Sequence, residues 1–198
     1  MSAEIHGDVD DGFGPVADAF GANFAKGGEL GAAVVLYVGG RKVVHLWGGV
    51  ADQRNGRPWV QDTPAIVFSV TKGVLAICAY QLVGQGRLDL DAPVARYWPE
   101  FATHGKAPIT VRMLLSHRAG LVALDRDLSF SDVLAWDPVI RAVEAQTPLW
   151  NPGTAHSYHA ITYGWLVGEV IRRITDKSPG KFLRTTEWAA SAMPALPC

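Results

Sequence analysis

The stretch "VFSVTKGVLAICAYQLV", residues 67–83, places Ser69 and Lys72 three positions apart at the start of an apolar helical pattern. Residues i and i+3 lie on the same face of a helix, so the lysine can reach the serine. A serine hydroxyl becomes an effective nucleophile when a neighbouring base removes its proton. A lysine is such a base when burial or nearby charge lowers its pKa. The stretch therefore predicts a helix that begins with a nucleophile and its base.

Spacing alone favours a structural interpretation of this pair, in which Ser69 caps the helix and Lys72 is solvated. The chain holds a second pair with the same spacing, Ser178 and Lys181 in "SPGK". A helix N-cap followed by proline at the first helical position is a sufficient explanation of that second pair. The chemistry of Ser69 and Lys72 therefore depends on what the rest of the chain adds.

The segments around this stretch indicate an α+β chain. Phenylalanine and valine recur at spacings of three and four over residues 13–24, which predicts an amphipathic helix. Two β-rich runs in residues 31–50 flank Gly39-Gly40 and predict a hairpin. Further helix starts are expected at Thr110 and at Asp137-Pro138. The order of helix, hairpin and long helical region lacks the β-α alternation of a doubly wound parallel sheet.

Composition restricts the classes of function. The chain has 198 residues, 48% of them hydrophobic and 19% charged, with a net charge of −1. This length suits one sizeable core, or one domain with an inserted subdomain. Near neutrality with no basic stripe argues against a nucleic-acid partner. Cys78 lies in an apolar helical run and is expected to be a buried free thiol. No cysteine cluster suggests a metal, and no phosphate-binding glycine loop suggests a cofactor.

The ends of the chain carry two further expectations. The start, "MSAEIHGDVDDGFGP", is acidic and lacks the basic and apolar regions of a secretory signal, so the expected compartment is the cytoplasm. Its acidic residues 8–11 are interpreted as a solvated terminus. No apolar stretch reaches about 18 residues, so no membrane span is expected.

Three segments together resemble a known family. They are "FSVTKGVLAICAYQLVGQGRLDLDAPVARYWPEF", "ITVRMLLSHRAGL" and "NPGTAHSYHAITYGWLVGEVIRR", in this order. The chain resembles the serine β-lactamase-like family over residues 12–184, and within it the branch of class C β-lactamases and family VIII esterases. The resemblance implies a β-lactamase/transpeptidase-like fold, with a helical subdomain and an antiparallel sheet. It also implies catalysis through an acyl-enzyme.

The resemblance assigns roles to individual residues. Ser69 matches the family's nucleophile, Lys72 its partner base, and Tyr158 the tyrosine of its Tyr-x-Asn motif, which shares proton transfer with the lysine. From the residues alone, Tyr158 could equally be a buried aromatic residue with a satisfied hydroxyl.

The loop around Tyr158 offers candidates for substrate binding. Trp150 precedes this loop, and His156 and His159 lie within it. Two histidines without a third ligand are a weak metal signal, so a loop or pocket role for them is favoured.

One departure from the family pattern bears on the substrate. Ala160 stands where the motif has asparagine, and alanine cannot hydrogen-bond a substrate amide through its side chain. This favours a small-molecule ester as substrate and predicts a serine ester hydrolase that needs no cofactor. A β-lactamase or D-Ala-D-Ala peptidase of the same fold is the alternative within this chemistry. A catalytically inactive fragment is the alternative outside it.

A second departure concerns the end of the chain. Family members continue with strands that carry a Lys-Thr-Gly or His-x-Gly motif, and no such triplet follows Tyr158. We therefore expect residues 1–198 to be a single incomplete domain that lacks the C-terminal strands of its sheet. Its parts are a helix and hairpin (12–66), a helical region (67–184) and a divergent tail (185–198) such as a frameshift would leave. Exposed sheet edges would then allow self-association.

Overall fold

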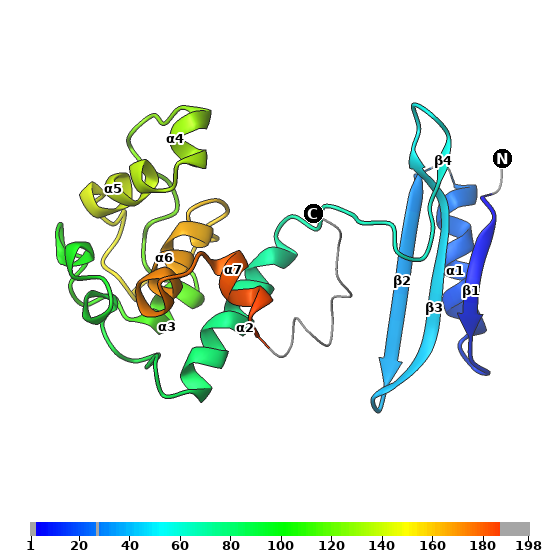
Figure 1. The fold of residues 1–198 in the computed structure, drawn as a ribbon, viewed down its shortest axis with the longest axis horizontal. Helices are drawn as coiled ribbons and strands as arrows, with labels where there is room; N and C mark the ends of the chain where they lie inside the picture. Colours follow the sequence, from blue (N-terminus) through cyan, green and yellow to red (C-terminus); the bar gives the residue numbers. More distant parts are fainter. Residues whose placement is uncertain (1–2, 27, 187–198) are drawn as a thin grey trace. The chain divides into compact units, whose positions relative to one another are not determined.

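The computed structural model describes residues 3–26 and 28–186 (Figure 1). The chain divides into two compact units, Met1–Ile66 and Val67–Cys198. The first unit combines strands with one helix, and the second is helical, so the α+β class is confirmed. The expected divergent tail lies, from residue 187 onward, outside the described residues.

The first unit is a small antiparallel sheet with a helix. Its elements are β1 (Ile5–Val9), α1 (Gly14–Ala25), β2 (Gly31–Val38), β3 (Arg41–Asp52) and β4 (Arg57–Pro58). The strand order is β1-β3-β2, and β4 pairs with part of β3. Among the described residues β2 pairs with β3 alone, and association through its free edge stays a prediction.

The predicted hairpin and first helix are both confirmed. β2 and β3 are joined by Gly39 and Gly40, whose positive φ angles of 56° and 78° suit the tight turn of a hairpin. Phe20 and Phe24 of α1 are buried together with Val44 and Leu46 of β3. Burial of this apolar face on the sheet stabilises a hairpin that is marginal by itself.

The acidic N-terminus includes a strand, and within it the solvated side chains expected at Asp8 and Asp11 are confirmed as exposed, whereas Asp10 is half-buried. Residues 5–9 form β1, with Asp8 opposite His45 of β3. The backbone N–H of Asp10 donates to the carbonyl of Val43 at 2.9 Å, and the Asp10 carboxylate pairs with Arg41. The partner strand lies more than 30 residues away, which no local pattern in residues 5–11 reveals.

The second unit is built from helices. They are α2 (Val70–Gly84), η1 (Val94–Arg96), η2 (Pro99–Ala102), α3 (Val111–Leu115), α4 (Phe130–Leu134), α5 (Asp137–Ala145), α6 (Tyr163–Thr175) and α7 (Pro179–Arg184). One core joins all of these helices except α4, and its members include Cys78 and Leu82 of α2 with Leu166 and Ile171 of α6. Cys78 is 1% exposed, which confirms the buried thiol.

Local capping starts two of these helices as predicted. The Thr110 side chain accepts the N–H of Met113 and begins α3. The Ser178 side chain accepts the N–H of Lys181 at 3.4 Å, with Pro179 at the first position of α7. The structural interpretation of the Ser178 and Lys181 pair is therefore confirmed.

A buried carboxylate joins α6 to α5. Glu169 is 0% exposed and accepts hydrogen bonds from Trp136 at 2.8 Å, Arg172 at 2.7 Å and Arg173 at 2.7 Å. Burial by itself raises the pKa of Glu169, but its hydrogen bonds to Arg172, Trp136 and Arg173 outweigh burial and lower that pKa below its ordinary value.

A buried lysine closes the end of α5. Lys106 is 0% exposed, and its Nζ donates to the carbonyls of Glu144 at 2.8 Å and Gln146 at 2.6 Å. These carbonyls lie at the C-terminus of the helix, where a positive charge is favourable. Burial nevertheless lowers the pKa of Lys106 to about 8, an effect that the charge of Glu144 partly offsets.

Because of Lys106, the free energy of unfolding should increase as the pH is raised through the alkaline range. Below pH 8 Lys106 carries its proton in both states and adds no slope. Between pH 8 and about 10.4 only the unfolded chain keeps that proton, so the free energy of unfolding should rise with pH, by about 3 kcal/mol at most. Denaturant unfolding at pH 7 and pH 10 should show this gain in the wild type and not in Lys106→Met. Lys181→Met, which alters an exposed lysine, is the control. An equal pH dependence in all three proteins would contradict the prediction.

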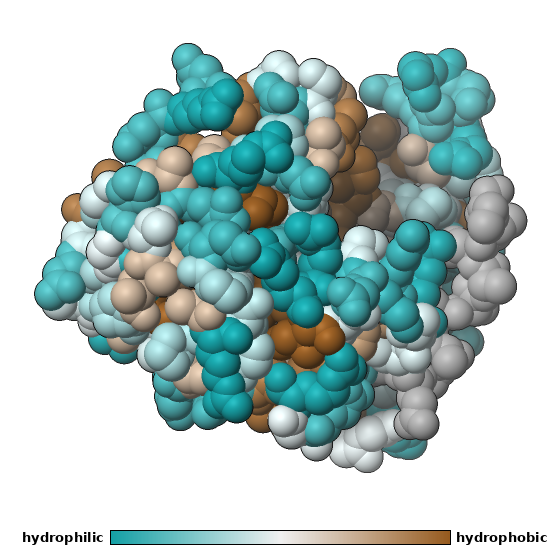
Figure 2. All heavy atoms as spheres, turned by 60° about the vertical axis from the view of Figure 1, so that its left-hand side comes forward, coloured by the Kyte–Doolittle hydropathy of each residue, from teal (hydrophilic) through white to brown (hydrophobic). Residues whose placement is uncertain are grey.

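The surface matches the ordinary globular composition. The face in Figure 2 is mostly hydrophilic, with smaller hydrophobic areas between the polar side chains. Among the helices that the structure describes, none has the length and apolar content needed to span a membrane.

Candidate active site

The entrance to α2 holds the serine in an exposed position. Phe68, directly before it, has a φ of 43°, a left-handed conformation that is costly for a residue with a β-carbon. Ser69 occupies the N-cap position of α2, yet its side chain makes no capping hydrogen bond. In this it differs from Ser178, and the structural interpretation of Ser69 as a cap is wrong.

Lys72 contacts the serine and a distant loop. Its Nζ lies 3.2 Å from the Ser69 Oγ and donates at 2.7 Å to the carbonyl of Ala160. The lysine is half-buried, so the interpretation of Lys72 as a solvated side chain does not hold. The contact with Ala160 ties the start of α2 to the segment that precedes α6.

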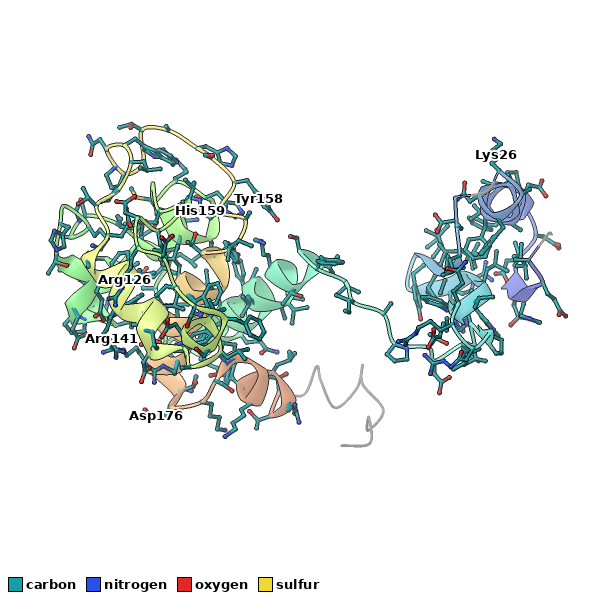
Figure 3. All side chains as sticks on the ribbon, turned by 90° about the horizontal axis from the view of Figure 1, so that it is seen from above. Lys26, Arg126, Arg141, Tyr158, His159 and Asp176 are labelled. Atoms are coloured by element: carbon teal, nitrogen blue, oxygen red, sulfur yellow. The ribbon has the colours of Figure 1, made fainter. Side chains whose placement is uncertain are left out.

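Tyr158 completes a cluster of three side chains. The Lys72 Nζ lies 4.9 Å from the centre of the Tyr158 ring. Hydrogen bonding with Ser69, followed by that with Lys72, lowers the pKa of the Tyr158 phenol, and burial has a smaller opposite effect. The ring is half-exposed at 49% and lies at the edge of the helical unit (Figure 3). The alternative of a buried Tyr158 is therefore wrong.

A mostly apolar pocket of about 300 Å³ opens beside this cluster. α2 and the segment leading into α6 form its walls. The lining residues are Phe68, Ser69, Thr71, Lys72, Leu75, Ala160, Ile161, Gly164 and Trp165. An apolar group attached to a carbonyl at Ser69 would find apolar walls here.

The other predicted residues lie outside this lining. His159 is 1% exposed; its Nε2 accepts the Leu121 N–H at 3.1 Å and its Nδ1 donates to the carbonyl of Ser157 at 2.7 Å. This environment gives His159 a structural place, because no ring nitrogen remains for a substrate. Trp150 is half-buried and packs edge-on against His159, with ring centres 6.4 Å apart. His156 is exposed near His117.

Two residues of the site had no assigned role in the sequence. The ring of His117 lies 5.0 Å from that of Tyr158, and the buried Tyr163 lies beneath Lys72, with 5.9 Å between the Lys72 Nζ and the ring centre. His117 stands in "LLSHRAG", one of the three family-like segments, and that position was the available signal. In the part of the chain described by the structure, no three histidine, cysteine, aspartate or glutamate residues gather as a metal site would require.

Comparison with known proteins gives a consistent result. A family model described as Beta-lactamase matches residues 16–194. The "Esterase/beta-lactamase LipL" of Mycobacterium tuberculosis is 38% identical over 173 residues, which cover 87% of this chain and 40% of that protein.

Two solved structures are similar as well. The crystal structure of a family VIII carboxylesterase has a TM-score of 0.87 at 43% identity, covering 92% of this chain and 50% of the other. A penicillin-binding protein homologue from Caulobacter crescentus has a TM-score of 0.90 at 40% identity, covering 94% and 50%. The chain thus spans half or less of the length of these relatives.

Proposed function

The chain belongs to the Beta-lactamase family and has its β-lactamase/transpeptidase-like fold, and on this premise we propose that it is a serine hydrolase that cleaves carboxylic esters. The observation that supports this proposal is the 3.2 Å contact between the Lys72 Nζ and the Ser69 Oγ, with the Tyr158 ring centre 4.9 Å from the same Nζ. A nucleophile and two proton-transfer groups thus meet beside one pocket.

The proposed first half-reaction forms an acyl-enzyme. Tyr158 accepts the serine proton through its phenol oxygen, and Lys72, whose Nζ lies 3.2 Å from the Ser69 Oγ, is the second group of the proton-transfer pair. The Ser69 Oγ then bonds to the ester carbonyl carbon, and the carbonyl oxygen takes up the displaced electron pair. When the carbonyl re-forms, the bond to the alcohol oxygen breaks, and the alcohol leaves with the proton held by Tyr158.

The second half-reaction returns the enzyme. Water gives a proton to Tyr158 and bonds to the acyl carbon, and Ser69 leaves and regains the proton. The backbone N–H of Ser69 is one donor for the oxyanion, since it makes no hydrogen bond to any residue that the structure describes.

Two features support esters as the substrate class. The side chain of Ala160 offers no hydrogen bond to a substrate amide, and the carbonyl of Ala160 is occupied by Lys72. The pocket walls from Phe68, Leu75 and Trp165 are apolar and suit a hydrocarbon acyl group. His156, the exposed histidine of the loop, remains our candidate for a contact with the substrate.

β-Lactam or D-Ala-D-Ala hydrolysis is the second candidate. It is favoured by the names of two relatives, an esterase/beta-lactamase and a penicillin-binding protein homologue. Both candidates use the same nucleophile, so an experiment must separate the substrates as well as locate the reacting serine.

A fluorophosphonate probe and two chromogenic substrates test the proposal. The probe should modify Ser69 alone among the eight serines, as read by peptide mass spectrometry. p-Nitrophenyl acetate or butyrate should be hydrolysed with a burst of nitrophenol, and nitrocefin should remain intact. Turnover of nitrocefin would favour the second candidate. Absence of both labelling and hydrolysis would favour a catalytically inactive chain.

A further inference from the structure

Residue 117 holds the backbone on both sides of Tyr158. The carbonyl of His117 accepts the N–H of Ser157 at 3.2 Å. The Nδ1 of the same residue accepts the N–H of His159 at 3.1 Å. Two peptide groups that flank the tyrosine are therefore fixed by one residue from a segment 40 positions earlier in the chain.

The ring of His117 also supports the tyrosine directly. Its centre lies 5.0 Å from the ring of Tyr158 and 4.9 Å from the ring of Tyr163. Lys72 lies over the same two tyrosine rings, at 4.9 Å and 5.9 Å from their centres. The Tyr158 ring beside Lys72 is thus positioned by contacts to the ring itself as well as to its backbone.

The far side of the loop is secured by His159. Its ring, which points into the helical unit next to Tyr158 (Figure 3), is bonded to Leu121 and Ser157. The segment 157–159 is therefore held between His117 on one side and the Leu121 backbone on the other.

The backbone conformation of His117 is one in which glycine is usually found. α3 ends in a pair of hydrogen bonds, from the His117 N–H to Leu114 and from the Arg118 N–H to Met113. This pattern places residue 117 in the left-handed region, and its φ is 60°. A histidine here tolerates strain that glycine would avoid. The imidazole supplies contacts to the Tyr158 loop that glycine could not.

From this geometry we propose that His117 is a positioning residue for the reaction, which holds Tyr158 against Ser69 and Lys72 through its neutral ring. The inference rests on the proposed function, because Tyr158 is the proton-transfer group there. An acceptor Nδ1 must carry no proton, so protonation of His117 would release the N–H of His159 and loosen the tyrosine.

The surroundings of His117 oppose that protonation. The groups that face it are Lys72 from α2, His156 and His159 from the loop, and the phenols of Tyr158 and Tyr163. Burial, followed by the neighbouring His159, His156 and Lys72, lowers the pKa of His117. The ring therefore stays neutral at neutral pH. Its Nδ1 then keeps the hydrogen bond from the His159 N–H, and we call this bond, together with the bond from the Ser157 N–H to the His117 carbonyl, the His117 clamp.

Two substitutions separate positioning from folding. His117→Gly suits the left-handed backbone and should fold, but it lacks the ring. His117→Asn also tolerates this backbone, and its side-chain oxygen can accept the His159 N–H. The glycine variant should lose about 10²-fold in kcat with a much smaller change in KM, whereas the asparagine variant should retain most of the wild-type kcat. Because asparagine does not titrate, the acid limb of its kcat profile should also move to lower pH.

Amide hydrogen exchange tests the His117 clamp without any substrate. Amides in the peptide that contains Ser157 and His159 should exchange faster in His117→Gly than in the wild type or in His117→Asn. A glycine variant with wild-type kcat, or an asparagine variant as slow as the glycine variant, overturns the positioning role. If the wild type shows no Ser69-dependent hydrolysis, the proposed function fails. In that case, equal exchange of these amides in His117→Gly and the wild type would still show that the His117 clamp does not hold the Tyr158 loop.

Discussion

Replacing Ser69 with alanine should abolish labelling by the fluorophosphonate probe and lower the rate of ester hydrolysis by about 10³-fold or more. The substitution removes the proposed nucleophile and leaves Lys72 and Tyr158 in place. Because the Ser69 side chain makes no capping hydrogen bond, the free energy of unfolding should change by less than about 0.5 kcal/mol. Burst kinetics with p-nitrophenyl butyrate and denaturant unfolding measure the two quantities.

The second Ser-x-x-Lys pair provides a matched control. Ser178→Ala removes a serine with the same spacing to a lysine, and this serine does cap its helix. The rate of hydrolysis should stay at the wild-type value, and stability should fall by about 1 kcal/mol. Ser69→Ala should thus lower the rate of hydrolysis and leave stability nearly unchanged, whereas Ser178→Ala should lower stability and leave the rate unchanged. Equal hydrolysis by wild type and Ser69→Ala would end the assignment of the nucleophile.

Replacing Glu169 with alanine should destabilise the helical unit by about 3–5 kcal/mol, because it removes the buried carboxylate shared by the Trp136 indole, Arg172 and Arg173. The arginines would keep only their contacts with Asp137 and with Glu100 and Glu144. The side chain is 0% exposed, so water does not replace the lost carboxylate without rearrangement. Asp91→Ala is the control, since Asp91 makes a similar two-bond contact with Arg112 at an exposed site. Its effect should be much smaller. Equal midpoints of denaturant unfolding for the two variants would contradict the prediction.

Glu169 should also contribute to acid sensitivity. Its pKa is lowered in the folded state, so the stabilisation is fully present above the ordinary carboxyl pKa and is lost as the pH falls through the folded value. Wild type and Glu169→Ala should therefore approach each other in stability as the pH is lowered from 7 to 3. A constant difference over that range would show that the charge of Glu169 is not the source of the effect.

One part of the candidate site, the pair of Ser69 and Lys72, could be predicted from residues close together in the sequence. Ser69 and Lys72 share one turn of helix, so their contact could be predicted from spacing. Tyr158 could be assigned by family resemblance, but its contact with Lys72 depends on a loop that folds back over α2. The place of His117 could not be predicted, because its partner His159 is 42 positions away and the left-handed backbone leaves no pattern in the sequence.

The sequence by itself determined the features of this protein that depend on neighbours a few residues apart. These are the hairpin at Gly39-Gly40, the caps at Thr110 and Ser178, and the face shared by Ser69 and Lys72, all governed by local backbone geometry.

Only the tertiary structure decided that β1 is a strand, that Lys106 and Glu169 are buried, and that His159 supports the site from within. These outcomes depend on which distant segments pack together. Burial and long-range hydrogen bonds arise from that packing, and a polar residue in the sequence shows neither in advance.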